Sequence, residues 1–445
     1  MIAYRGFLTR KNCGNSQSAG LVMAFVYFQT YGCQMNVADS DELRRKLLNH
    51  GFSETDSTDN ADLIVVNTCS VRQNAEDKAK ARITQFSRIK KSHAQLWVTG
   101  CMAQRLGDSL KKQIPGISLV IGAKEIDNLD EIINQNLLLT EFNNQESIIP
   151  RSEASDYLTI MRGCNNYCAY CIVPYVRGVE VSLPARDIEN SIKKRISEGV
   201  REIVLLGQNV NSYNDSGIDF SDLLVRIASI DGLKRLRFMT SHPKDCSEKL
   251  IRTVADVPEL CHHIHLPVQA GSDRILAVMN RKYTTSDYMN RVEMINKYLP
   301  DADITTDIIV GFPTETDEEF KQTLKIVSNV RYTTAFMFAY SAREGTAAAN
   351  IPDDIPKPEK LDRLSRLIET QSAITRELYD SMIGKTIEVM VNGKQEKRDQ
   401  LWMGQNSGCK RVLISCDNAQ SGMILKTKVT RSSGMTLICE DCKTS

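Results

Sequence analysis

The sequence has no long apolar run. The longest one near its start, Leu21–Phe28, is too short to cross a bilayer. It is also not followed by the small-residue cleavage site of a secretory signal peptide. We therefore expect neither secretion nor a membrane partner, and we predict a cytoplasmic protein.

Acidic residues are missing from the first part of the chain, up to Asp39. The stretch before it contains Ser, Asn and Gly and only a few basic residues, among them Arg5, Arg10 and Lys11. This composition predicts a disordered leader over residues 1–22, with an organellar transit peptide as the alternative. The net charge of +1 excludes no class of partner.

Cysteine, in contrast, is plentiful, with 13 residues. Without a secretory signal, this number indicates metal chemistry or free thiols rather than a disulfide framework. A chain of 445 residues also exceeds what a single hydrophobic core usually supports, so two or three domains are expected.

Short apolar runs alternate with amphipathic helical stretches in the first domain, which we place at residues 23–139. The expected strands are 23–31, 61–68 and 95–100, and the expected helices are 40–49 and 74–90. This alternation is typical of a doubly wound parallel sheet in an α/β domain.

Three cysteines directly follow the expected strands, in the segments YGC, NTC and TGC. These sheet cysteines are Cys33, Cys69 and Cys101. Because parallel strands end at the same edge of a sheet, where ligands bind, we expect the three thiols to meet in space. Small buried hydrophobic side chains are the alternative, but this does not explain why all three occupy the same topological position.

A polar stretch at 140–155 is typical of a linker, and a second α/β domain follows at 156–382. Its expected strands are 157–161, 202–206, 235–239, 263–266, 304–310 and 335–340. Six βα units predict a partial barrel with its site at the carboxyl ends of the strands. Polar or glycine-rich loops follow several of these strands, at 207–209, 241–243, 267–272 and 311–313.

The first barrel strand ends in a C-x3-C-x2-C loop that contains Cys164, Cys168 and Cys171, the loop cysteines. The nearest histidines in the sequence are the distant His93 and His242. A structural zinc ion would need four ligands and hence a long-range partner. An iron–sulfur cube held by three thiolates instead leaves one iron free to bind something else.

Alternating apolar and polar positions at 383–438 predict a small antiparallel, OB-like β-barrel. From Ile383 onward, ten Lys and Arg stand against six Asp and Glu, which permits RNA contact. Residues 439–445 are expected to form a tail in which Cys439 and Cys442 are solvated thiols.

Other side chains have a structural and a functional interpretation. We interpret His262, His263 and His265 as hydrogen-bonded core or cofactor-lining residues rather than metal ligands, since they lie in a barrel strand. Arg177 and Arg343 lie near expected site loops and either hold a carboxylate or phosphate or have no special role.

Several segments together resemble the methylthiotransferases, a family of radical S-adenosylmethionine enzymes. They are TYGCQMNVADSD, VVNTCSVRQNAEDK, VTGCMAQ, RGCNNYCAYCIVPYVRG, LLGQNVNSY, HLPVQAGSDRILAVMNR and GFPTETDEEF. The resemblance covers residues 24–435. The QMN, SVR and PVQ-GSDR-MNR segments are similar to the branch that makes 2-methylthio-N6-isopentenyladenosine in tRNA.

The resemblance implies S-adenosylmethionine and two [4Fe–4S] clusters as cofactors. The loop cysteines would hold a cluster whose open iron chelates S-adenosylmethionine. The sheet cysteines would hold a second cluster, where the transferred sulfur is attached and methylated. The implied cofactor-binding residues are Tyr170, Gln208, Ser241, Gln269, Gly311, Phe312 and Arg343.

The implied partners are tRNA bearing N6-isopentenyladenosine, an electron donor such as flavodoxin or ferredoxin, and a sulfur donor. By resemblance the C-terminal barrel corresponds to a TRAM domain. Its segment GQNSGCK, at 404–410, departs from the family pattern, which leaves RNA contact by this segment open.

The resemblance implies one of three substrates, namely an isopentenylated adenosine, a threonylcarbamoylated adenosine or an aspartate of a ribosomal protein. The last two carry a carboxylate and call for cations, whereas an isopentenyl group calls for an apolar lining. The expected mouth offers Met35, Val71, Tyr170, Ile172, Val173, Tyr175 and Phe312, with Arg72 and Arg177 as nearby cations. We therefore predict methylthiolation at C2 of N6-isopentenyladenosine just 3′ of the anticodon. The alternative from another class is a non-catalytic iron–sulfur RNA-binding redox sensor.

Overall fold

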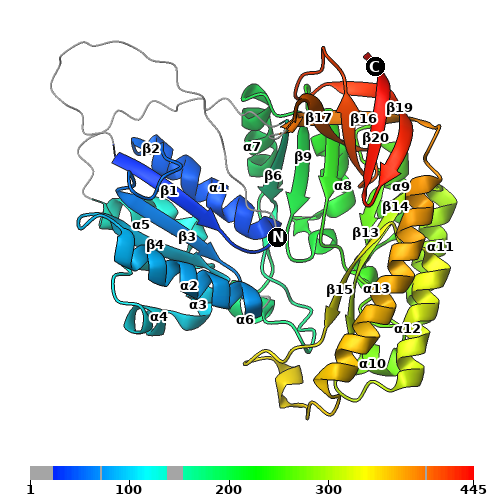
Figure 1. Ribbon diagram of the computed structural model, residues 1–445, viewed down its shortest axis with the longest axis horizontal. Coiled ribbons are helices and arrows are strands. Elements are labelled where there is room, and N and C mark those ends of the chain that lie inside the picture. The colour runs from blue at the N-terminus through cyan, green and yellow to red at the C-terminus, as the bar shows by residue number, and fades with distance from the viewer. Residues whose placement is uncertain (1–23, 71–72, 138–153, 396–397, 445) are drawn as a thin grey trace. The chain divides into compact units, whose positions relative to one another are not determined.

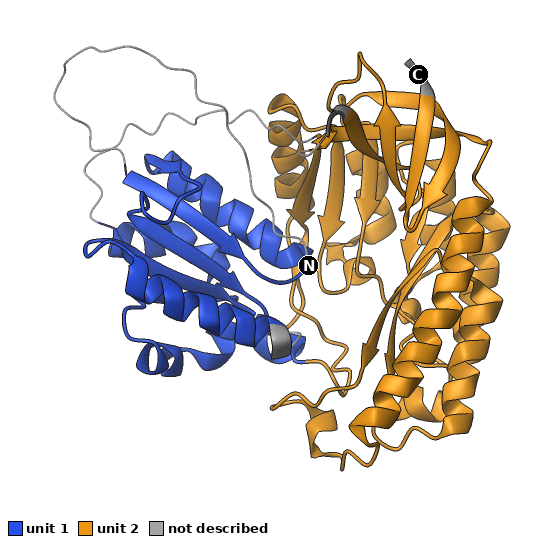
Figure 2. Ribbon diagram, viewed as in Figure 1, with its two compact units in different colours: residues 1–148, 172–178 blue, residues 149–171, 179–445 orange. Residues whose placement is uncertain are grey.

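The computed structural model describes residues 24–70, 73–137, 154–395 and 398–444. The chain divides into two compact units, of which unit 1 comprises Met1–Ile148 and Ile172–Gly178 (Figure 2). Unit 2 comprises Ile149–Cys171 and Val179–Ser445. The expected leader and most of the expected linker lie outside the described residues. No helix that the structure describes is sufficiently long and apolar to span a membrane.

Unit 1 is built on a five-stranded sheet in the order β2-β1-β3-β4-β5, in which every neighbouring pair is parallel. Its strands are β1 Ala24–Thr30, β2 Phe52–Glu54, β3 Leu63–Thr68, β4 Gln95–Gly100 and β5 Leu119–Gly122. Its helices are α1 Gln34–Asn49, α2 Gln73–Ile89, α3 Cys101–Leu106, α4 Asp108–Gln113, η1 Ile126–Asn128, α5 Leu129–Asn136 and α6 Val173–Arg177. The expected doubly wound parallel sheet is confirmed (Figure 1).

Two apolar cores lie on opposite faces of this sheet because successive side chains of a strand point to opposite sides. Ile64 and Val66 of β3 belong to one core, and Leu63 and Val65 belong to the other. Since both faces are covered, β3 is a continuous apolar run, as is typical of a central parallel strand.

Six parallel strands of unit 2 form two three-stranded ladders, β12-β9-β6 and β13-β14-β15. They are β6 Ser155–Thr159, β9 Glu202–Leu206, β12 Arg235–Phe238, β13 His263–His265, β14 Asp303–Val310 and β15 Thr334–Ala339. A parallel bridge between Leu236 and Leu260 joins β12 to the chain just before β13. This arrangement confirms the expected partial (β/α)6 barrel.

The helices of unit 2 connect these strands. They are α7 Ala185–Ser197, η2 Val210–Ser212, α8 Phe220–Ala228, η3 Pro243–Asp245, α9 Glu248–Asp256, α10 Asp273–Val278, α11 Thr285–Tyr298, α12 Asp317–Val330, η4 Ala347–Asn350 and α13 Lys357–Asp380. Two short antiparallel strand pairs are also present, β7 Met161–Arg162 with β8 Val181–Ser182 and β10 Asn214–Asp215 with β11 Ile218–Asp219.

A closed barrel in the order β16-β17-β18-β20-β19 ends the chain. Its strands are β16 Thr386–Gln395, β17 Arg398–Asn406, β18 Arg411–Ser415, β19 Ile424–Ser433 and β20 Thr436–Thr444. The expected small barrel is confirmed, although the β18–β20 pair is parallel. The expected tail is wrong, since β20 continues through it and Cys439 is buried in the barrel core rather than solvated.

This terminal barrel is docked on the beginnings of strands in the partial barrel. Arg235, the first residue of β12, donates from Nη1 to the carbonyl of Gln405 at 2.6 Å. Asp303, the first residue of β14, accepts from the backbone N–H of Cys409 at 2.8 Å and pairs with Lys410. The 404–410 segment is therefore held by the opposite end of the strands from the one that carries the loop cysteines.

Candidate functional site

The sheet cysteines lie together at one edge of the unit 1 sheet. Each follows one of three adjacent strands, β1, β3 and β4. A Cβ added to Gly32 would lie 2.7 Å from Cβ of Cys69, so the turn that carries Cys33 touches the turn that carries Cys69. Cys33 and Cys101 interact electrostatically with each other and with Arg177. The three residues thus come to one edge, as their positions after the strands predict.

Two buried amide side chains fix the turns that carry these cysteines. Asn36 accepts from Sγ of Cys33 at 3.3 Å, and its Nδ2 donates to Oδ1 of Asn67 at 2.8 Å and to the carbonyl of Thr68 at 2.9 Å. Asn67 returns a hydrogen bond from Nδ2 to the carbonyl of Asn36 at 2.9 Å. Cys33 is also the N-cap of α1.

A buried arginine approaches the sheet cysteines from α6. Nη2 of Arg177 donates to Oδ2 of Asp39 at 2.8 Å, and both side chains are almost fully buried. Nη1 of Arg177 is buried without a hydrogen-bond partner among the described residues. Burial raises the pKa of the Cys101 thiol, and the positive charge of Arg177 opposes this shift. Arg177 is therefore placed to stabilise negative charge on these sulfur atoms.

Consecutive residues anchor the segment that carries the loop cysteines in unit 2. The backbone N–H of Ala169 donates to the carbonyl of Met279 at 2.9 Å. Nδ2 of Asn280 donates to the carbonyl of Tyr167 at 2.8 Å. Nη1 of Arg281 lies 3.2 Å from Sγ of Cys168. The MNR segment at 279–281 is thus the structural support of this loop, a role that the sequence did not reveal.

A chain of contacts links this loop to the end of β12. Nε of Arg281 donates to the hydroxyl of Tyr283 at 3.1 Å, and the Tyr283 ring lies edge-on to His242 at 5.6 Å. Burial and the nearby charge of Arg281 lower the pKa of His242 to about 2. This histidine is therefore neutral at physiological pH.

After β9 and β12 lie buried polar atoms that have no hydrogen-bond partner within the part of the chain that the structure describes. They are Nε2 and Oε1 of Gln208, Oδ1 of Asn209, Oγ of Ser241 and Nε2 of His242. Buried polar atoms are normally paired, so such a group indicates a ligand site. Gln208 and Ser241 were predicted as cofactor-binding residues, whereas Asn209 and His242 were missed because their pairing depends on the fold.

Family and sequence comparisons place the chain among known proteins. Residues 158–327 match the radical SAM superfamily, and residues 25–122 match the family described as Uncharacterized protein family UPF0004. The chain is 42% identical over 437 residues to the tRNA-2-methylthio-N(6)-dimethylallyladenosine synthase of Syntrophus aciditrophicus, with 94% of this chain and 95% of that protein covered. This chain belongs to that enzyme family.

A second relative agrees with this assignment, and a solved structure has a similar fold. The tRNA-2-methylthio-N(6)-dimethylallyladenosine synthase of Geobacter metallireducens is 41% identical over 431 residues, which cover 93% of this chain and 98% of that protein. The radical S-adenosylmethionine methyltransferase TsrM from Kitasatospora setae has a similar fold, with a TM-score of 0.55 and 13% identity. The match covers 74% of this chain and 77% of that chain. The family match over residues 158–327 and the two relatives show that the chain is a radical SAM enzyme.

Three further residues that the sequence predicts to bind cofactor differ in their burial and contacts. Gln269 is buried in a left-handed conformation, with φ of 68°, and Tyr170 lies 3.4 Å from Arg281. Arg343 is half-buried. A left-handed backbone conformation such as that of Gln269 is uncommon for residues other than glycine, and it concentrates at functional sites.

Gly311 and Phe312, also predicted to bind cofactor, pack against side chains of the chain itself. A Cβ at Gly311 would lie 2.5 Å from Cγ of Lys360, so the missing side chain leaves room for Lys360. Phe312 has no exposed surface and packs against Tyr340 with ring centroids 5.0 Å apart. Both residues therefore have a packing role in the chain, and their contact with cofactor stays a prediction.

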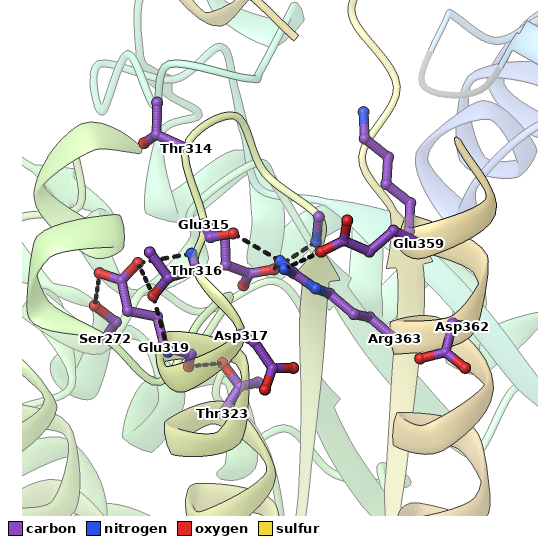
Figure 3. A network of polar contacts seen from close by, with 12 residues as sticks. Ser272, Thr314, Glu315, Thr316, Asp317, Glu319, Thr323, Glu359, Asp362 and Arg363 are labelled. Atoms are coloured by element: carbon purple, nitrogen blue, oxygen red, sulfur yellow. Dashed lines mark hydrogen bonds and ion pairs between the residues drawn. The ribbon is translucent and has the colours of Figure 1, made fainter. Parts of the chain in front are cut away.

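A polar network joins the loops that follow β13 and β14 (Figure 3). Oγ of Ser272 donates to Glu319 at 2.9 Å, and the backbone N–H of Thr316 donates to the same carboxylate at 2.9 Å. A Cβ at Gly271 would lie 2.5 Å from Cα of Thr323, so only glycine permits this approach to α12. The GSDR and TETDEEF segments therefore position loops.

The loop after β14 is also tied to α13 (Figure 3). Glu315 accepts from Nη1 of Arg363 at 2.8 Å and from the backbone N–H of Gly311 at 2.7 Å. Both charged side chains are almost fully buried. Breaking such a buried pair leaves an uncompensated charge, so the pair fixes the geometry of this loop.

The histidines of β13 are hydrogen-bonded core residues, in keeping with their interpretation from sequence. Nε2 of His263 and Nδ1 of His265 lie 2.9 and 3.0 Å from Oγ1 of Thr305. Among the described residues, no three His, Cys, Asp or Glu side chains converge as ligands of one metal ion. In an iron–sulfur cube each thiolate binds its own iron, so its thiolates do not converge in this way.

Proposed function

We propose that this enzyme adds a methylthio group to C2 of N6-dimethylallyladenosine in tRNA, at the position 3′ of the anticodon. The observation that carries the proposal is the pair of cysteine triads, each at the carboxyl ends of parallel strands in its own unit. The family relationship supports the same activity.

The residues around both triads fit two [4Fe–4S] clusters. Sheet cysteines Cys33, Cys69 and Cys101 would hold one, beside Nη1 of Arg177, for which no described residue is a hydrogen-bond partner. Loop cysteines Cys164, Cys168 and Cys171 would hold the other, beside Arg281. Buried cations near both triads suit the negative charge of thiolates on iron and sulfide.

The unpaired groups after β9 and β12 would bind S-adenosylmethionine, whose amino, carboxylate and ribose groups need hydrogen-bond partners. Gln208 offers an amide donor and an amide acceptor, Asn209 offers an acceptor oxygen, and Ser241 and neutral His242 offer further polar atoms. Gln269, Tyr170 and Arg343 would complete the lining. The bound cofactors supply the electron and the radical that activate an aromatic C–H bond, whereas this chain binds, orients and excludes water.

The reaction requires an external electron donor, for which flavodoxin or ferredoxin is suitable, and a sulfur donor. It takes place where tRNA is modified, which we expect to be the cytoplasm. RNA contact in the terminal barrel would come from exposed lysines of β19, because the 404–410 segment is used in docking. Lys426 and Lys428 alternate along that strand with buried residues.

Anaerobic reconstitution tests this proposal against a non-catalytic redox sensor. We expect about eight irons per chain, since two cubes contain four each. With a reductant, the enzyme should release 5′-deoxyadenosine from S-adenosylmethionine. Iron binding without any 5′-deoxyadenosine would contradict the enzyme and support the sensor.

A further inference from the structure

Arg281 is a buried arginine in direct contact with a loop cysteine. Its side chain and backbone together are 9% exposed, and its Nη1 lies 3.2 Å from Sγ of Cys168. Nη2 donates to the carbonyl of Pro267 at 3.2 Å, and Nε donates to the hydroxyl of Tyr283 at 3.1 Å. Tyr283 is itself held at 2.9 Å from the carbonyl of Val268. The guanidinium is therefore fixed by neutral groups on one side and faces the cysteine on the other.

The other buried arginines of the described chain have a carboxylate partner. Arg177 pairs with Asp39 at 2.8 Å, and Arg237 pairs with Glu202 at 2.9 Å. Arg235 and Arg363 pair with Glu388 and Glu315, at 3.1 and 2.8 Å. The described contacts of Arg281 are with a thiol, two tyrosine hydroxyls and a carbonyl. A buried cation without an anion is costly, so this contrast indicates a negative partner at the cysteine loop.

We propose that Arg281 is the positioning counter-ion of the iron–sulfur cluster at the loop cysteines and that it sets the reduction potential of this cluster. The proposal rests on the proposed function. Three thiolates on a [4Fe–4S] core leave net negative charge, which grows by one unit when an electron enters from the external donor. A fixed cation and an N–H···S hydrogen bond stabilise the reduced form more than the oxidised form.

The guanidinium stays protonated throughout, because its pKa is far above any physiological pH. No proton accompanies the electron at this residue. Arg281 thus makes the cluster easier to reduce, which matters because the electron must pass from a protein donor to a site that cleaves a stable sulfonium. Arg281 acts on the reduction potential of the cluster, and this effect does not require contact between Arg281 and substrate.

A variant of Asn280 distinguishes an electrostatic role of Arg281 from simple support of the loop. It anchors the same loop through Nδ2 to the carbonyl of Tyr167 at 2.8 Å but carries no charge. Its φ of 56° lies in the left-handed region, which glycine adopts without strain. Asn280→Gly therefore removes an uncharged contact to the same loop, one residue away from Arg281, and leaves the Arg281 cation in place.

The test uses the full-length, anaerobically reconstituted chain as wild type, Arg281→Met, Arg281→Lys and Asn280→Gly. Iron and sulfide are counted, and each protein is titrated with reductant while electron paramagnetic resonance follows the cluster signal that changes when S-adenosylmethionine is added. We expect Arg281→Met to lower the ratio of reduced to oxidised cluster about tenfold at a given potential, equivalent to about 59 mV for one electron. Arg281→Lys should shift less, and Asn280→Gly should titrate as wild type.

Wild-type potentials in both Arg281 variants would overturn the proposal, as would an equal shift in Asn280→Gly. If Arg281→Met does not retain iron, Arg281→Lys decides: a lower potential supports the proposal and an unchanged one overturns it. A wild-type chain without a signal that responds to S-adenosylmethionine would instead contradict the proposed function.

Discussion

Arg237 donates from Nη1 to the backbone carbonyl of Ser407 at 2.9 Å, across 170 positions of the chain. The same guanidinium pairs with Glu202 at 2.9 Å and is almost fully buried. It therefore joins β9 and β12 of the partial barrel to the 404–410 segment of the terminal barrel. Since this segment is engaged inside the chain, its departure from the family pattern does not bear on RNA contact elsewhere in the barrel.

Replacing Arg237 with Met should destabilise unit 2 by about 3–5 kcal/mol, because Glu202 would be left as a buried, uncompensated charge. Thermal unfolding followed by circular dichroism measures the loss. Arg252→Met is the control, because Arg252 pairs with Glu248 at the surface and should leave the unfolding midpoint unchanged. A midpoint of Arg237→Met equal to wild type would contradict the docking role.

Replacing Lys426 and Lys428 together with Ala should weaken tRNA binding and make its logarithmic salt dependence less steep by about one to two units, since each lost phosphate contact removes about 0.7–0.9. Binding is measured by filter retention over a series of salt concentrations. Lys249 and Lys321, exposed lysines on the partial barrel, supply the matched double-alanine control. An unchanged salt slope in the Lys426 and Lys428 variant would transfer RNA contact to other surfaces.

His263 should make the protein sensitive to acid. Burial, with the charge of Arg237, lowers its pKa from 6.5 to about 3. Between these values the unfolded chain binds a proton that the folded chain does not, so stability is full above pH 6.5 and falls as pH decreases. The slope from this residue is at most about 1.4 kcal/mol per pH unit.

His263→Gln can still bond to Thr305 but does not titrate. Chemical denaturation at pH 7, 6, 5 and 4 should therefore show a shallower loss of stability than wild type. His93→Gln removes an exposed histidine instead and serves as the control. The same slope in His263→Gln and wild type would contradict the assignment.

The two cysteine triads should separate functionally. Replacing Cys33, Cys69 and Cys101 with Ala should leave cleavage of S-adenosylmethionine measurable and abolish methylthiolation. The corresponding change of the loop cysteines should stop both reactions, since radical formation precedes sulfur transfer. Chromatography of 5′-deoxyadenosine and mass spectrometry of product measure the two steps. Methylthiolated product from the first variant would show that the sheet cysteines are not the sulfur-transfer site.

The sheet edge and its cysteines were predictable because apolar runs end at Cys33, Cys69 and Cys101, and strand ends of a parallel sheet coincide. The start of α1 was not predictable in this way. The sequence placed it at Ser40, whereas α1 begins at Gln34 with Asn36 and Ser40 buried. These polar side chains are buried because Asn67, a long-range partner, satisfies them, and such pairing leaves no apolar period in the sequence.

The role of Arg281 was hidden for a similar reason. The MNR segment was visible as part of a resemblance, but its contact with Cys168 spans 113 positions of the chain. Unpaired atoms of Asn209 and His242 likewise become informative only once their surroundings are known. Local pattern thus predicts elements and strand-end residues, whereas partners that meet only after folding require the structure.

The choice of substrate tests the proposed activity most directly. The enzyme is turned over anaerobically with S-adenosylmethionine on tRNA from cells with and without the isopentenyl modification, and nucleosides are analysed by mass spectrometry. We predict 2-methylthio-N6-isopentenyladenosine from the modified tRNA, with unmodified adenosine a much poorer substrate. Equal product on both tRNAs, or activity only on threonylcarbamoylated tRNA or a ribosomal protein, would contradict the assignment of isopentenylated tRNA as the substrate.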